Sequence, residues 1–208
     1  MEQNIAILVA DLSGYTALTE MHGSDSAADL IDKYLEIVQN SLSGESRLHE
    51  RKGDEVMIVS TSSSDLFSTA ALLVQHTSNE PNFLQVHGGL HWGKVLNRNN
   101  HYFGTTINLA SRIAGKARPG SFWCSNDYLN TLKEKYLSNF KSMGPHSFKN
   151  LNSETELFEL MFDNPKSFYI DPVCRMLVSK DQSATPHPTE NDIFFCSPVC
   201  RDVYVRAK

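Results

Sequence analysis

This sequence has fewer basic than acidic residues, no long apolar run and no internal repeat. The first two features each argue against a class of protein. The 208 residues carry 19 Lys and Arg against 24 Asp and Glu, so the formal net charge of -5 argues against a general nucleic-acid binder, which usually has a basic stripe. The longest apolar runs are too short to span a bilayer. No basic region followed by an apolar stretch and a cleavage site opens the chain. We therefore expect a cytoplasmic protein that binds neither nucleic acid nor membrane.

Cysteine is also sparse, and its distribution is uneven. Four cysteines are few for a disulfide scaffold of this length. Cys124 stands alone, whereas Cys174, Cys196 and Cys200 all fall within the last 35 residues. In a cytosolic chain, clustered cysteines indicate a metal site before a disulfide. For Cys124 we expect burial in a strand rather than chemistry.

Segments typical of strands and of helices alternate over the first 163 residues. Their mixed order, with a hairpin turn at Gly53-Asp54, indicates an α+β sandwich rather than a doubly wound parallel sheet. The expected strands are Ile5–Ala10, Arg47–Glu50, Glu55–Ser60, a pair within Phe83–Leu96 bent at Trp92-Gly93, Ser121–Ser125 and Glu156–Met161. The expected helices are Asp25–Leu42, Ser64–Gln75, Thr106–Ala117 and Asn126–Tyr136.

A change of composition near residue 164 divides the chain. Residues 1–163 form the large domain, residues 164–170 read as a linker that contains Asn164-Pro165, and residues 171–208 form a small cysteine-containing module. A segment of about 40 residues rarely folds without a metal, a disulfide or a partner surface. The small module therefore needs one of these supports.

Two aspartates in the large domain sit at the ends of expected strands. Asp11 directly follows an apolar run, where a charge is costly unless it is paired. Asp54 lies in the expected hairpin turn, and the two strands can be neighbours in one sheet. Converging carboxylates form a hard-oxygen site that suits Mg²⁺ and phosphates. Taken singly, each aspartate is more typical of a turn cap beside glycine.

A second polar pair lies on the expected helix Thr106–Ala117. Asn108 and Arg112 are four residues apart, so they share one helical face. Together they can hydrogen-bond a sugar oxygen and neutralise a phosphate. The alternative is an ordinary solvated face.

The order of these pieces resembles one family. The stretches VADLSGYTALTE, KGDEVMIVS, GGLHWGKV, YFGTTINLASRIAGKARPGSFWCS and FKNLNSETELFEL occur in the order and spacing of class III adenylate/guanylate (nucleotidyl) cyclase catalytic domains. The resemblance covers roughly residues 4 to 162. It implies a ferredoxin-like, cyclase-type α/β sandwich for the large domain.

The resemblance also implies a metal centre and a reaction. Asp11 and Asp54 match the two aspartates that hold two Mg²⁺ or Mn²⁺ ions, and the carbonyl of Leu12 matches a further ligand. The implied substrate is a nucleoside triphosphate. Its 3′-hydroxyl attacks the α-phosphate with metal assistance, and the products are a cyclic nucleotide and pyrophosphate.

Three further positions carry over from the family. Asn108 matches the asparagine that orients the ribose, Arg112 the arginine that stabilises the transition state, and Lys149 the lysine on the triphosphate. In the family, the metal aspartates come from one protomer, and the asparagine and arginine come from the other. The resemblance therefore implies a homodimer with active sites at its two-fold interface.

The substrate base is set by two other positions in the family. Glu50 stands where adenylyl cyclases usually carry Lys and guanylyl cyclases usually carry Glu, which favours GTP. His101 stands where Asp is normal for adenine and Cys is frequent for guanine, and it fits neither pattern. The base stays open between GTP, ATP and a pyrimidine triphosphate, and His101 is equally typical of an exposed loop.

The C-terminal segment resembles a different module. Its stretches DPVCRMLVSKDQ and FFCSPVCRDVYV are similar to the YHS domain, a small cysteine-containing module related to metal-handling domains. Cys174, Cys196 and Cys200 can bind Zn²⁺ or Cu⁺, with His187 or an exogenous ligand completing a tetrahedron. The alternatives are that the cysteines pack as buried hydrophobes, and that His187, between two prolines, lies in an exposed loop.

The sequence therefore favours a nucleotidyl cyclase whose C-terminal cysteines regulate it through metal or redox state. Two alternatives stay open. One is a catalytically inactive, nucleotide-binding homologue, and His101 is the feature that favours it. The other is a metal-sensing protein that uses the large domain only as a dimer scaffold.

Overall fold

A computed structural model describes residues 1–149, 153–162, 168–179 and 184–207, and its centre is one eight-stranded sheet. The strand order is β2-β3-β1-β4-β6-β8-β7, and β5 pairs with β4 off this path. The strands of the sheet are β1 (Glu2–Ser13), β2 (Arg47–Lys52), β3 (Glu55–Ser60), β4 (Gln85–Arg98), β5 (His101–Phe103), β6 (Phe122–Ser125), β7 (Phe140–His146) and β8 (Thr155–Leu160). The helices packed with it are α1 (Tyr15–Ser41), α2 (Ser63–Asn79), α3 (Thr105–Ala114), α4 (Asn126–Leu129) and the 3₁₀ helix η1 (Glu134–Asn139).

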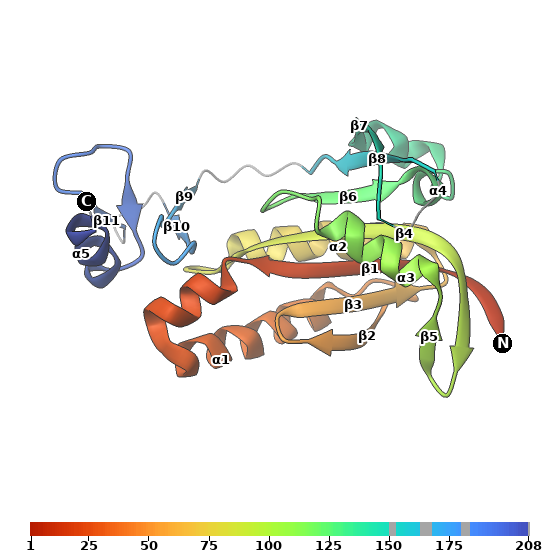
Figure 1. The fold of residues 1–208 in the computed structure, drawn as a ribbon, viewed down its shortest axis with the longest axis horizontal. Helices are drawn as coiled ribbons and strands as arrows, with labels where there is room; N and C mark the ends of the chain where they lie inside the picture. The colour runs from red at the N-terminus through yellow and green to blue at the C-terminus, as the bar shows by residue number, and fades with distance from the viewer. Residues whose placement is uncertain (150–152, 163–167, 180–183, 208) are drawn as a thin grey trace.

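Strand β1 runs through the middle of the sheet and is buried on both faces. Ala6, Leu8 and Ala10 face the core that α1 and α2 cover, whereas Ile5, Ile7 and Val9 face the core beneath α3. Figure 1 shows α3 in front of the sheet, on the opposite face from α2. The alternation of side chains along a strand produces these two cores. The mixed sheet with helices on both faces confirms the predicted α+β sandwich.

The predicted pair of strands within Phe83–Leu96 is a single long strand. Strand β4 pairs with β1 in one unbroken antiparallel register, from Glu2 opposite Leu96 to Ser13 opposite Gln85. Gly93 is therefore no bend. It lies beneath α3, where an added Cβ would meet the Thr106 Oγ1 at 2.8 Å. The glycine allows close approach between helix and strand, and the prediction mistook that role for a turn.

Other boundaries also differ from expectation. Helix α1 begins at Tyr15, ten residues before the predicted start, and it is broken at Gly23, where φ is 85°. Strands β5 and β7 were not predicted at all. The predicted helix Asn126–Tyr136 is split into α4 and η1. The remaining predicted elements are confirmed to within a few residues, including the β2–β3 hairpin around Gly53-Asp54.

The C-terminal segment is a separate arrangement of short elements. Strands β9 (Phe168–Ile170) and β10 (Leu177–Ser179) form one ladder, β11 (Thr185–Pro186) and β12 (Phe194–Phe195) form another, and α5 (Pro198–Arg206) follows. Figure 1 places them beside the end of β1 and the start of α1. Residues 168–170, expected as linker, are thus a strand, and residues 163–167 lie outside the described part. None of the described helices is long and apolar enough to cross a membrane.

Candidate functional site

The two predicted metal-binding aspartates come together. Asp11 lies near the end of β1, and Asp54 lies in the tight turn between β2 and β3. The two carboxyl groups are within hydrogen-bonding reach of each other, since each one perturbs the other through a side-chain hydrogen bond. The antiparallel pairing of β1 with β3 produces this meeting, because it brings the β2–β3 turn to the end of β1.

Burial perturbs both acids, and each acid also acts on the other. Burial raises the pKa of Asp11 above its usual range, whereas a hydrogen bond with Asp54 and one from the Leu12 backbone oppose this rise. Burial followed by the charge of Asp11 raises the pKa of Asp54 to about 6. Among the described residues, no lysine or arginine forms an ion pair with either carboxylate. The arrangement is a compact, uncompensated anionic site that a divalent cation fits.

Sequence reasoning missed His87 beside this pair. It lies on β4 directly opposite Asp11, and its Nδ1 is 2.9 Å from the hydroxyl of Ser13. Burial lowers the pKa of His87, which favours the neutral imidazole. No sequence signal separates this histidine from any other on a strand. Leu12 has a buried side chain, and the role of its carbonyl stays a prediction.

The three predicted phosphate and ribose residues form a second group around α3. Asn108 is exposed and Arg112 is half-buried, one turn apart on the helix. The Arg112 guanidinium donates a hydrogen bond to the backbone carbonyl of Lys149. Phe148, buried against Leu109 and Ile113 of α3, holds this part of the chain beside the helix. The structure thus brings Arg112 and Lys149 together.

No hydrogen bond or ion pair joins the two groups in the described part of the chain. The aspartate pair lies at the end of β1 and in the β2–β3 turn. The group around Arg112 lies on the face of the sheet that α3 covers. Each group is a partial site.

Glu50 lies on β2 and His101 on β5, and both are exposed. The residue next to Glu50, His49, has its ring centroid 4.6 Å from that of Tyr102, the residue next to His101. Burial and then Arg47 lower the pKa of His49, whereas Glu50 opposes this shift and His101 adds to it. The expectation of an exposed loop at His101 is half right, because the residue is exposed but lies on a strand.

The three C-terminal cysteines form a cluster, and a histidine from the large domain joins it. Cys174 and Cys200 are buried and Cys196 is half-buried, all as free thiols. Their sulfur atoms and a ring nitrogen of His22 all lie within 4.8 Å of one another. His22 belongs to α1, and no sequence signal links it to cysteines more than 150 residues away. Cys124 is separate and fully buried, as expected.

His187 does not join this cluster. Its side chain is only 7% exposed, and its ring packs near Phe195 and Tyr204. His187 lies in a loop after β11, as expected, but its side chain is not exposed. Among the described residues, the histidine that joins the three cysteines is His22 and not His187.

Comparisons with known proteins agree with the fold of the large domain. No protein-family model matches the chain. An uncharacterised protein of Mycobacterium tuberculosis is 34% identical over 159 residues, which cover 76% of this chain and 41% of that protein. An adenylate cyclase of Glutamicibacter nicotianae is 30% identical over 129 residues, 62% of this chain and 32% of that protein. The chain therefore spans less than half the length of these curated relatives.

Solved structures show the same fold at lower identity. One of the adenylate cyclases from Trypanosoma brucei, analysed in their monomeric state, superposes with a TM-score of 0.71 at 16% identity and covers 86% of this chain and 94% of its own. Guanylyl cyclase structures also match. The large domain has the fold of nucleotidyl cyclase catalytic domains.

Proposed function

We propose that the chain is a nucleotidyl cyclase that converts a nucleoside triphosphate into the 3′,5′-cyclic monophosphate and pyrophosphate. The observation that carries this proposal is the meeting of Asp11 and Asp54 at the end of β1. It stands on a fold shared with adenylate and guanylate cyclase structures and on relatives named adenylate cyclase. Carboxylates at this place suit the chemistry of phosphoryl transfer.

Asp11, Asp54 and the carbonyl of Leu12 would hold Mg²⁺ or Mn²⁺, two ions per active site. The fit rests on the donor set, because the two oxygen ligands lie together without a neutralising lysine or arginine among the described residues. When bound, the ions lower the pKa of the ribose 3′-hydroxyl and screen charge on the leaving pyrophosphate. Asn108 orients the ribose, and Arg112 and Lys149 neutralise charge that develops on the phosphates.

A homodimer completes the site. No hydrogen bond or ion pair joins the aspartate pair to the α3 group in the described part of one chain. The proposed active site takes the first group from one protomer and the second from its partner. The β4–β5 hairpin supplies apolar surface for such a contact. Leu96 and Phe103 are opposite each other on it, 42% and 53% exposed.

The nucleobase contacts in this proposal are Glu50 and His101. A carboxylate at position 50 can accept hydrogen bonds from a guanine edge, which favours GTP. The relatives with assigned names are adenylate cyclases, which favours ATP. The proposed enzyme works in the cytoplasm, where nucleoside triphosphates are present and the C-terminal thiols stay reduced.

The test is turnover with each of the four ribonucleoside triphosphates. The purified 208-residue chain is incubated with each one and Mn²⁺, with a metal-free reaction as control, and the products are identified by mass. We expect a cyclic monophosphate and pyrophosphate from GTP or ATP when Mn²⁺ is present, and no product in the metal-free control. Nucleotide binding without product would favour the inactive homologue. Bound metal at the cysteines with neither product nor nucleotide binding would favour the metal-sensing scaffold.

A further inference from the structure

The cysteine cluster draws its side chains from four separate places in the chain. Cys174 follows β9, Cys196 follows β12, Cys200 lies in the first turn of α5, and His22 lies in α1 of the large domain. The Nε2 atom of His22 is 3.6 Å from the sulfur of Cys196 and 3.6 Å from that of Cys200. Residues so distant in sequence converge on one point, with soft ligand atoms turned inward.

The spacing of these atoms matches a tetrahedral metal site. Bonds of about 2.3 Å to sulfur and about 2.1 Å to nitrogen, at tetrahedral angles, separate sulfur from sulfur by about 3.8 Å and sulfur from nitrogen by about 3.6 Å. The observed sulfur separations are 3.5 Å for Cys174 and Cys196 and 3.6 Å for Cys196 and Cys200. These distances are far longer than a disulfide bond of about 2.05 Å.

A buried carboxylate fixes two of the cysteine loops. Asp171 is fully buried, and its oxygens accept hydrogen bonds from the backbone N–H groups of Val173 at 2.8 Å, Cys174 at 3.2 Å and Cys196 at 2.8 Å. Such a partner holds the ligand-bearing loops in place, as groups around metal ligands do. Sequence reasoning did not single out this residue.

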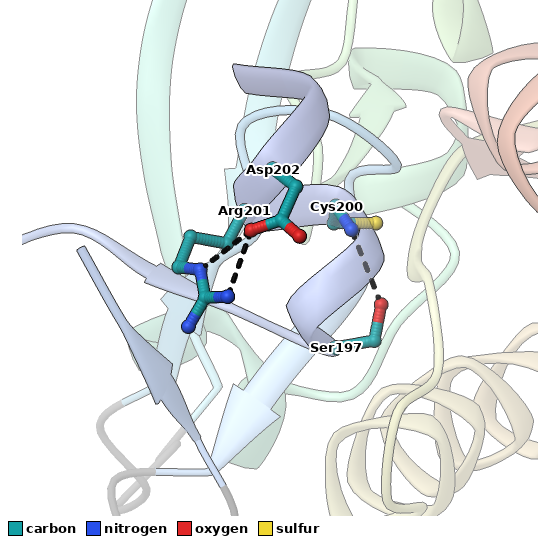
Figure 2. A network of polar contacts seen from close by, with 4 residues as sticks. All are labelled: Ser197, Cys200, Arg201 and Asp202. Carbon is teal, nitrogen blue, oxygen red and sulfur yellow. Dashed lines mark hydrogen bonds and ion pairs between the residues drawn. The ribbon is translucent and has the colours of Figure 1, made fainter. Parts of the chain in front are cut away.

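The third cysteine is fixed by the cap of α5. The hydroxyl of Ser197 accepts a hydrogen bond from the Cys200 N–H at 3.3 Å, which positions the first turn of the helix (Figure 2). Farther along this helix, Arg201 and Asp202 form an ion pair between neighbouring side chains (Figure 2). That pair lies on the other side of the helix from the sulfur of Cys200 (Figure 2).

The core around the cysteines is small. Leu177 and Val178 of β10 are also buried, and the Leu177 N–H donates a hydrogen bond of 2.7 Å to the Phe83 carbonyl of the large domain. Among the described residues, the core cluster of the segment contains only three buried members, Cys174, Phe195 and Cys200, and two of these are the thiols themselves. So small a core does not offset the entropy of ordering the chain. A bound metal supplies the missing free energy, as it does in small zinc modules.

The start of α1 in the large domain places His22 at the cysteine cluster. Helix α1 breaks immediately after this residue, at Gly23, with φ of 85° and ψ of 169°. This backbone conformation is one that L-residues rarely adopt, so glycine is required there. Met21 packs into the core of the small segment beside the cluster. The start of α1 thus belongs structurally to both parts of the chain.

We propose that Cys174, Cys196, Cys200 and His22 bind one Zn²⁺, which ties the C-terminal segment to α1 of the large domain. Three thiolates and one imidazole form a closed tetrahedral set, which is typical of structural zinc and leaves no open position for catalysis. This site differs from one built only from residues of the small segment, because its fourth ligand comes from the large domain. It does not rest on the proposed cyclase function.

The test measures metal, not turnover. The 208-residue chain, purified without added chelator, is analysed for zinc and copper by mass spectrometry. Zinc affinity is then measured in competition with a chromophoric chelator, and cobalt is substituted to record the visible spectrum of a tetrahedral site. His22→Ala is compared with His22→Cys, which keeps a soft ligand, and with the matched control His187→Ala, which removes a histidine of the small segment outside the cluster.

We expect one zinc per chain and a tetrahedral thiolate spectrum with cobalt. His22→Ala weakens zinc binding by at least about 100-fold and alters the cobalt spectrum. His22→Cys retains tight binding, and His187→Ala, which loses only packing on Phe195 and Tyr204, keeps the parental cobalt spectrum. Circular dichroism of each variant checks that the large domain is folded. Equal zinc affinity in His22→Ala and the parent, copper in place of zinc, or no bound metal in the folded parent would each overturn the proposal.

Discussion

The aspartate pair and the cysteine cluster differ in what supports them. The two carboxylates meet at the end of β1, on a sheet with long backbone ladders. The three thiols and the imidazole converge from segments that share only a small core. The first site stands on strands with extensive buried surface on both faces. The second stands on two-stranded ladders of two or three residue pairs. Hard oxygen ligands mark the first site and soft sulfur ligands the second.

The difference indicates what a metal contributes at each place. The sheet folds by burying its apolar strands, so ions at Asp11 and Asp54 add chemistry to a structure that exists without them. The core cluster of the cysteine segment is small, so the proposed zinc would contribute stability. The two proposals thus assign a metal two different roles.

The two places are also physically connected. Gly14, the residue before α1, lies so close to Arg175 that an added Cβ would be 2.4 Å from the Arg175 Cβ. Arg175 follows Cys174 directly, and Gly14 is three residues after Asp11. The first part of α1 is therefore held by the C-terminal segment at both ends, at Gly14 and at His22. This contact gives the proposed regulation of the enzyme by its cysteines a structural route.

The largest expected effect comes from a substitution that removes turnover at the aspartate pair and leaves the cysteine cluster unchanged. Asp11→Ala removes one oxygen ligand from the proposed catalytic metals, and we expect cyclic nucleotide formation to fall by at least about 1000-fold. Its circular dichroism and zinc content remain those of the parent, because Asp11 contributes repulsion rather than packing. The exposed Asp29 on α1 offers a matched control, and Asp29→Ala keeps parental turnover. Parental turnover in Asp11→Ala would contradict the assignment of this carboxylate.

A second experiment removes the zinc and follows amide hydrogen exchange by mass spectrometry. A zinc-selective chelator is added in excess Mg²⁺, so that only the cysteine site is emptied. We expect amides of residues 168–179 and 184–207 to exchange at least about 100-fold faster, while β1 and β4 keep their protection. Faster exchange also reaches the start of α1, next to Gly14, and turnover declines with it.

The control for this experiment is the reverse removal. Withdrawing Mg²⁺ while zinc stays bound leaves exchange in the C-terminal segment unchanged. If the segment keeps its protection without zinc, its small core suffices and the contrast between the two sites disappears. If the sheet loses protection as well, the two parts unfold as one cooperative unit.

The sequence predicted the first site far better than the second, for physical reasons. Asp11 and Asp54 stand at the ends of strands with strong apolar patterns, so local signals placed them at one edge of the sheet. His22 carries no such signal, because it lies in the part of α1 that the apolar spacing did not reveal. Its partners are more than 150 residues away. Long-range convergence depends on tertiary packing, and one sequence does not encode it in any local period.

One glycine led to a wrong prediction in β4, and another lies at a break in α1 that was not predicted. Gly93 marks close packing of α3 on β4, and local rules read it as a bend. Gly23 marks the break in α1 that follows His22. Gly93 is explained by a helix packed on it, and Gly23 by its own positive φ. The strands β5 and β7 escaped prediction because they are short or largely exposed and lack strong apolar alternation.

The smallest expected effect concerns the pH dependence of the aspartate pair. The pKa of Asp54 rises from 3.8 to about 6 on folding without metal, so the folded state favours the protonated acid. The stabilisation is complete below pH 3.8 and is lost as pH rises through about 6. A shift of two pKa units corresponds to about 3 kcal/mol, and solvent screening reduces it to about 1 to 2 kcal/mol.

Urea unfolding between pH 4.5 and 7, without added divalent ions, measures this loss. Asp54→Asn removes the titration, so the difference between parent and variant grows as pH rises, with the parent losing stability. Added Mg²⁺ above pH 6 restores stability to the parent and has little effect on Asp54→Asn, because ligand binding stabilises the state that binds it. Parallel curves for the two proteins would mean that the carboxylates do not repel each other in solution. Zinc content should follow neither curve, since the cysteine cluster shares no ligand with the aspartate pair.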